Sequence, residues 1–89
     1  MEYNIEEYAA MFKALSDETR LKILTMLVKG KTCACRLLDE FHFTQPTLSY
    51  HMKQLTDSGL VKGEKDGKWV YYLVNSERLN FLKDFLTKI

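Results

Sequence analysis

The sequence predicts a mainly α-helical domain that carries one small β-hairpin, in the order α-α-α-α-β-β-α over residues 1–89. Apolar residues recur at helical spacing up to residue 59 and again after residue 75. Between residues 61 and 74 the pattern changes to the alternation of two strands. Two short helical segments in the middle are separated by about three residues, which is typical of a helix-turn-helix. We therefore expect a single winged helix-turn-helix domain.

Two helices are expected in the N-terminal third. The first covers residues 3–15, with Asn4 as N-cap and a hydrophobic staple between Tyr3 and Tyr8. Its apolar stripe is expected to contain Ile5, Tyr8, Phe12 and Leu15. The second helix begins at Asp17 and ends before Gly30. Its apolar residues cover more than one face, so we expect it to be central and mostly buried; they are Leu21, Ile23, Leu24, Leu27 and Val28.

The helix-turn-helix is expected in the middle of the chain. Its first helix starts at the cysteines and ends near His42, with Leu37, Leu38 and Phe41 facing inward. Its second helix lies within residues 44–59, because Thr44 is a good N-cap and Gly59 supplies a left-handed stop. Its inward stripe is expected to contain Leu48, Met52 and Leu55.

The outer face of this second helix carries hydrogen-bonding groups and little charge, which suits the reading of base edges in DNA. His51 stands at the edge of the apolar stripe, where it is either half-buried or able to reach DNA. The predicted DNA contacts on this helix are Gln45, Thr47, Ser49, Tyr50, His51, Lys53 and Gln54.

A hairpin and a last helix complete the chain. The strands are expected at residues 61–64 and 69–74, with basic Lys65 and Lys68 near the tip, where they suit phosphate contact. Asn75 or Ser76 caps the last helix. The first and last helices offer more apolar surface than one small core needs, so we expect them to form a homodimer interface, although packing on each other within one chain is the alternative. The predicted interface residues are Ile5, Tyr8, Phe12, Leu79, Leu82, Phe85 and Leu86.

Composition narrows the possible functions. The net charge is only +1, although residues 20–36 carry basic side chains and no acidic ones. No apolar run approaches the length of a membrane span and Met1 does not open a signal peptide, so we expect a soluble, cytoplasmic protein without membrane contact. No motif for catalysis or for a cofactor is found, so we expect neither an enzyme nor a bound cofactor.

Cys33 and Cys35 are the only cysteines, and we expect them to be thiols in a reducing cytoplasm. Helix N–H groups and nearby Lys31 and Arg36 favour the thiolate, which binds soft metals and reacts with oxidants. Residues i and i+2 of a regular helix point about 200° apart, whereas in an extended segment they project from the same side, so one ion can meet both sulfurs only if this helix start is frayed or unwinds. A redox sensor and a thiol pair without ligand remain alternatives.

Taken together, three phrases resemble the ArsR/SmtB family of winged-helix repressors: ALSDETRLKIL, TCACRLLDEFHFTQPTLSYHMKQLTDSGLV and GKWVYYLV. The resemblance implies a homodimer that binds an imperfect palindromic operator in its own promoter and is released by an inducer. Cys33 and Cys35 match the trivalent arsenic and antimony site of the arsenic-responsive branch. Arg36 stands where that branch often has Asp, and Leu38 where some members have a third cysteine.

The function expected from the sequence is therefore repression of a metalloid-resistance operon, with arsenite or antimonite as the inducer at Cys33 and Cys35. Cadmium or lead sensing is disfavoured because residues 1–32 contain no cysteine, and a zinc site on the last helix because residues 76–89 contain no histidine. A winged-helix module that binds only protein, through its first and last helices, is the alternative from another class.

Overall fold

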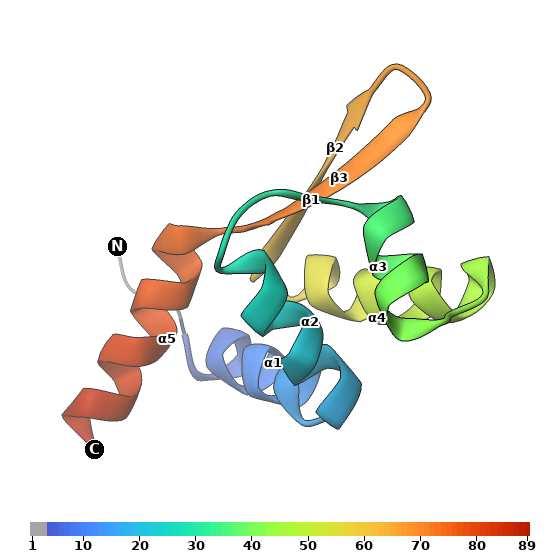
Figure 1. Cartoon of the computed structure of the whole chain (residues 1–89). Helices are drawn as coiled ribbons and strands as arrows, with labels where there is room; N and C mark the ends of the chain where they lie inside the picture. Colours follow the sequence, from blue (N-terminus) through green and yellow to red (C-terminus); the bar gives the residue numbers. More distant parts are fainter. Residues whose placement is uncertain (1–3) are drawn as a thin grey trace.

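The computed structural model describes residues 4–89, which form five helices and a three-stranded sheet (Figure 1). The predicted order of helices and hairpin is confirmed, with the addition of a short strand before the third helix. The elements are α1 Ile5–Leu15, α2 Glu18–Leu27, β1 Thr32–Cys33, α3 Ala34–Phe41, α4 Gln45–Asp57, β2 Val61–Asp66, β3 Trp69–Val74 and α5 Ser76–Lys88.

The helices begin where side-chain caps occur in the sequence. The Asn4 side chain accepts a hydrogen bond from the Glu7 N–H at 2.9 Å, and Thr44 accepts one from the Thr47 N–H at 3.4 Å. Asn75 caps α5 by accepting from the Arg78 N–H at 3.3 Å, which decides between the two predicted caps. Each such cap stabilises its helix by about 1 kcal/mol. The expected staple involves Tyr3 and lies outside the described residues.

One core connects all five helices to the base of the sheet. The inward stripe predicted for α4 is confirmed, because Leu48, Met52 and Leu55 are almost fully buried. The buried apolar residues are Met11, Ala14, Ile23, Leu27, Leu37, Leu48, Met52, Leu55, Leu60, Val61 and Leu82. Among the described residues, no helix is long and apolar enough to cross a membrane.

Three burial predictions need correction. In α1 the core residues are Met11 and Ala14, whereas Ile5 of the predicted stripe is 69% exposed. The face that carries Met11 and Ala14 lies next to the predicted stripe, and α1 packs against α2 and α4. Helix α2 is not mostly buried, because Leu21 is about half exposed, as is Val28, the C-cap residue that follows the helix. Leu82, predicted at a dimer interface, is a core residue of its own chain. In each helix apolar residues occupy two adjacent faces, and the spacing alone does not show which face packs inward.

The sheet places the first cysteine beside the wing, the hairpin formed by β2 and β3. The strand order is β1-β3-β2 and both pairings are antiparallel. Thr32 pairs with Tyr72 and Cys33 with Tyr71, so Cys33 and Tyr71 share one face of the sheet. Figure 1 shows that the hairpin projects beyond the helices. Helix α3 lies beside α4, near the base of the hairpin. The two-residue strand β1 was not predicted because it is too short to show alternation.

Candidate DNA-binding surface and cysteine site

The exposed face of α4 carries most of the predicted base contacts. Gln45, Thr47, Ser49 and Lys53 are exposed, Tyr50 keeps 58% of its surface, and Gln54 is half-buried. The helix starts cleanly because Pro46 stands in the first turn, where its missing N–H is not needed. Lys53 is paired with Asp57 at 3.0 Å, but both side chains are exposed, so this ion pair contributes little and can rearrange.

His51 is held from the interior of the protein. Arg20, only 9% exposed, donates from Nε to the Ala14 carbonyl at 2.6 Å, and one of its terminal nitrogens lies 3.2 Å from His51 Nδ1. Because a guanidinium can only donate, Nδ1 acts as the acceptor and the ring proton sits on Nε2. The His51 side chain is 14% exposed. This residue of α4 therefore points inward, and we assign it to holding the helix in place.

Asp17 completes the cluster around Arg20. Its carboxylate caps α2 by accepting a hydrogen bond from the Arg20 N–H at 3.0 Å. That hydrogen bond, together with the charge of Arg20, holds the pKa of the Asp17 carboxyl below its ordinary value. One feature of the sequence indicates that Arg20 is buried. Arg20 precedes the core residues Ile23 and Leu27 by three and seven positions, which places it on the inward face of α2.

Arg78 of α5 holds the C-terminal end of α4. Its guanidinium donates to the Ser58 carbonyl at 3.0 Å and lies 3.9 Å from the Glu7 carboxylate of α1. Its side chain also packs against Gly59, which has a φ of +84° and would meet Arg78 if it carried a Cβ. Through Arg78, the end of α4 is thus tied to α5 and α1, the two helices that were predicted to form the dimer interface.

The wing presents basic and aromatic groups toward solvent. Lys65 and Lys68 are both exposed. The Lys68 ammonium lies 5.5 Å from the centre of the Trp69 ring, and that ring is 48% exposed. Gly63 leaves room for the facing Tyr72, because a Cβ there would lie 3.3 Å from its ring. An exposed tip of this kind can meet a phosphate backbone.

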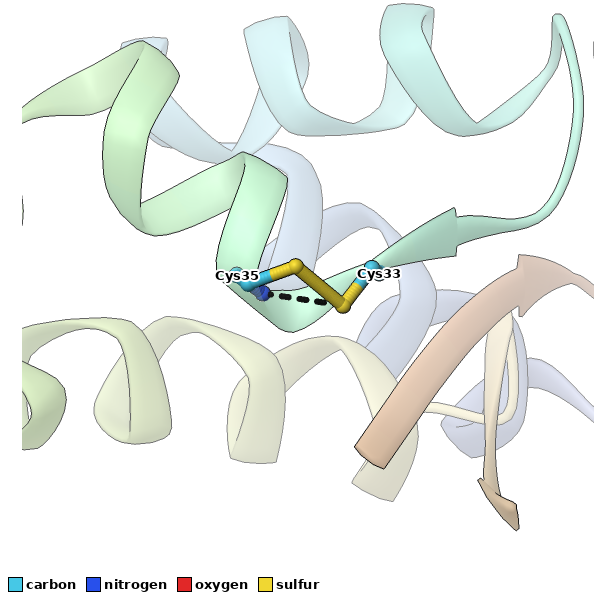
Figure 2. Close-up of a disulfide and its surroundings, with 2 residues drawn as sticks. All are labelled: Cys33 and Cys35. Atoms are coloured by element: carbon cyan, nitrogen blue, oxygen red, sulfur yellow. Dashed lines mark hydrogen bonds between the residues drawn. A yellow bond between two sulfur atoms is a disulfide. The ribbon is translucent and has the colours of Figure 1, made fainter. Parts of the chain in front are cut away.

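The two cysteines meet at the junction of β1 and α3 (Figure 2). Cys33 is the N-cap of α3 in an extended conformation, and Cys35 is the second residue of the helix. Their Cα atoms are 5.2 Å apart and a disulfide joins the sulfurs, so the expectation of two free thiols is not met in this structure. The Cys35 N–H also donates to the Cys33 Sγ at 3.3 Å.

The structure meets the condition that the two cysteines are not both helical. Helix α3 begins at Ala34, and Cys33 lies outside it in an extended conformation. An extended residue followed by a first helical turn brings the two sulfurs together without further change. The described residues contain no group of three His, Cys, Asp or Glu side chains that could hold a metal ion, so a third ligand from residues 4–89 is not in place.

The chain is similar to known proteins over most of its length. Residues 17–62 match the family described as bacterial regulatory protein, arsR family. The chain is 46% identical over 81 residues to a protein of Staphylococcus xylosus named arsenical resistance operon repressor, covering 91% of this chain and 78% of that protein. It is also 46% identical over 79 residues to a Bacillus subtilis protein of the same name, covering 88% and 75%.

Solved structures agree with these matches. A crystal structure described as an ArsR family transcriptional regulator has a TM-score of 0.86 at 26% identity and covers 99% of this chain and 91% of its own. A structure from Mycobacterium bovis has a TM-score of 0.78 at 26% identity, covering 94% and 81%. It is described as a homodimeric winged helix-turn-helix DNA-binding domain of a possible ArsR-family regulator.

Proposed function

Because this chain belongs to the bacterial ArsR family of regulatory proteins, which are DNA-binding transcription factors and not enzymes, we propose that it is a dimeric repressor of an arsenic-resistance operon. In this proposal, trivalent arsenic binds Cys33 and Cys35 and releases the protein from its operator in the cytoplasm. The observation that carries the proposal is the meeting of both sulfurs at the first turn of α3, the leading helix of the helix-turn-helix. Antimonite offers the same coordination chemistry.

The inducer requires the reduced form of the cysteine pair. Two electrons and two protons convert the disulfide to two thiols, a state that a cytoplasm maintains. Each thiol then replaces one hydroxide on arsenous acid, forming an As–S bond and releasing water. The backbone N–H that reaches the Cys33 sulfur stabilises its thiolate, which is the reacting species.

DNA recognition uses α4 and the wing. The exposed polar side chains at the start of α4 enter the major groove, while Lys65 and Lys68 contact phosphates. Exposed apolar residues of α1 and α5 join two copies, and Ile5, Phe12 and Leu86 are the most exposed of those predicted there. A two-fold dimer places two α4 helices on an imperfect palindrome, about 34 Å apart.

The cysteine site adjoins both parts of this DNA-binding surface. Helix α3, which contains Cys35, packs on α4, and β1, which contains Cys33, pairs with wing strand β3. A change in the backbone between these two cysteines therefore reaches the recognition helix and the wing together. Inducer binding is expected to weaken operator binding, because it favours positions of α4 and the wing that do not match the DNA grooves.

Substitutions on the two parts of this surface should have different effects. Gln45→Ala or Ser49→Ala is expected to cost about 1 to 3 kcal/mol at the operator and little on unrelated DNA, because a base contact is lost. Lys65→Ala should weaken binding to all sequences similarly and reduce the salt dependence by about one phosphate contact. Fluorescence anisotropy on operator and scrambled duplexes measures both. If Gln45→Ala lowers the affinity for both duplexes equally, Gln45 does not contact a base.

The disulfide favours one second candidate, a repressor whose cysteine pair senses oxidants. It predicts that peroxide, and not arsenite, releases DNA from the reduced protein. The same anisotropy measurement decides between the two inducers.

A further inference from the structure

Trp69 is the only tryptophan of the chain, and it stands at the tip of the wing. It is the first residue of β3 and follows the turn at Gly67 by two positions. Tyr72 and Val74 of the same strand pack against the core. Because side chains alternate along a strand, Trp69 lies on the opposite face, which is turned away from the core. An aromatic side chain with 48% of its surface exposed therefore stands where the hairpin projects beyond the helices (Figure 1).

The neighbours of Trp69 leave this ring open to a partner. Across the hairpin it is paired with Asp66, an exposed residue whose short side chain is too small to cover an indole. The Lys68 ammonium lies 5.5 Å from the centre of the ring, within the range of a cation–π contact. At an exposed position that contact is weak, so the ammonium can turn to an anion while the ring packs against an apolar surface.

The wing carries little net charge. Residues 61–74 contain three lysines and two acidic residues, and one of these acids, Glu64, is paired with Lys31 at 3.4 Å. A contact with DNA through this hairpin therefore gains from apolar surface as well as from phosphates. DNA offers apolar surface in the deoxyribose rings that line the minor groove, a groove in which proteins frequently place apolar side chains.

The position of the wing relative to α4 determines which part of the DNA it meets. Helix α4 packs against β2, and α3 packs against β3. A phosphate backbone stands on either side of a major groove, and a minor groove lies beyond it. With α4 in the major groove, a hairpin that projects beyond the helices can reach the adjacent backbone and minor groove (Figure 1). Lys68 and Trp69 at its tip then meet a phosphate and the sugars beside it.

We propose that the Trp69 ring packs against deoxyribose in the minor groove beside the operator half-site, while Lys68 leaves the ring for the neighbouring phosphate. The inference rests on the proposed use of α4 and the wing in DNA recognition, and it adds an apolar contact to the ionic ones. The ligand is duplex DNA, bound at its sugars and not at its base edges. Such a contact adds affinity without reading the sequence directly.

Fluorescence of the reduced wild-type protein tests this contact, because all tryptophan emission comes from Trp69. On addition of a saturating operator duplex, we expect the emission maximum to move to shorter wavelength and quenching by acrylamide to decrease, since the ring leaves water. A scrambled duplex at low salt should produce the same changes. Emission and quenching that stay unchanged while the anisotropy of labelled DNA shows full binding would overturn the proposal.

Substitutions separate an apolar contact from an ionic one. Trp69→Thr keeps a residue that favours a strand but removes the ring, and it should lower the affinity for both duplexes about tenfold. The slope of log affinity against log salt concentration should not change, because an apolar contact releases no counterions. Lys68→Gln should instead reduce that slope by about one phosphate contact. Trp69→Phe, which retains an aromatic ring, should recover most of the lost affinity.

Leu21→Gln is the matched control. Leu21 is 47% exposed on α2, nearly as much as Trp69, and removal of its apolar surface should leave the DNA affinity unchanged. Circular dichroism shows whether each variant is folded, and the wild-type fluorescence decides the matter if Trp69→Thr is not. A folded Trp69→Thr variant that binds both duplexes as tightly as the wild type would overturn the proposal. Wild-type protein that binds neither duplex would overturn the proposed function itself.

A second copy of the chain is the competing partner of the ring. If Trp69→Thr weakens the dimer in sedimentation, and the wild-type emission changes with protein concentration but not with DNA, Trp69 is a dimer contact and the proposal is wrong. An unchanged dimer together with an emission that depends on DNA supports it.

Discussion

Replacing Arg20 with methionine is expected to lower the free energy of unfolding by about 3 kcal/mol, because a buried guanidinium loses two hydrogen bonds and leaves two acceptors unpaired. Those acceptors are the Ala14 carbonyl and the Nδ1 atom of His51. Methionine fills much of the same space, so the loss reports hydrogen bonding more than packing. Urea denaturation followed by circular dichroism measures the change.

A matched control stands two residues away. Lys22→Met removes a cation from the same helix, but this side chain is 63% exposed and its pair with Glu18 is weak, so its cost should stay within about 0.5 kcal/mol. If Arg20→Met costs no more than this control, the cluster does not hold α4. Operator affinity measured below the unfolding transition should also fall for Arg20→Met, since His51 lies on α4, the helix proposed to read the operator.

Locking Cys33 and Cys35 as a disulfide is expected to lower the arsenite sensitivity by on the order of 100-fold or more, since both As–S bonds are lost. The oxidised protein contains no free thiol, because these are its only cysteines. Arsenite titration of diamide-oxidised protein on its DNA, before and after reduction by a phosphine, measures the effect. The response should return on reduction.

The same experiment separates the two uses of the cysteine pair. An arsenite midpoint that is unchanged by oxidation would show that the metalloid binds elsewhere. Release of DNA by oxidation alone, with no further effect of arsenite on the reduced protein, would favour the oxidant sensor.

Much of this fold could be predicted because its signals are local. Thr44 and Asn75 cap the helices they precede, and the inward stripe of α4 was correct because its spacing leaves only one narrow apolar face. In α1 and α2 two apolar faces compete, so the choice of core residues depends on which neighbour each face meets. That information is tertiary and is absent from helical spacing.

The candidate site was predictable in its residues but not in its geometry. The cysteines were identified by type and spacing, yet the position of the α3 N-cap depends on the pairing of Cys33 with Tyr71, which lies 38 residues further along the chain. Arg20 and Arg78 were missed as supports of α4 because each acts through a contact that is distant in sequence. Basic residues on a helix ordinarily suggest a solvated face.

The most direct test is an arsenite titration of the reduced dimer bound to DNA from its own promoter, read by fluorescence anisotropy. We predict that arsenite releases the wild-type protein, and that the Cys33→Ser, Cys35→Ser variant binds the same DNA and stays bound at every arsenite concentration. Wild-type protein that remains on its operator at saturating arsenite, or a double variant that is released equally well, would contradict the account.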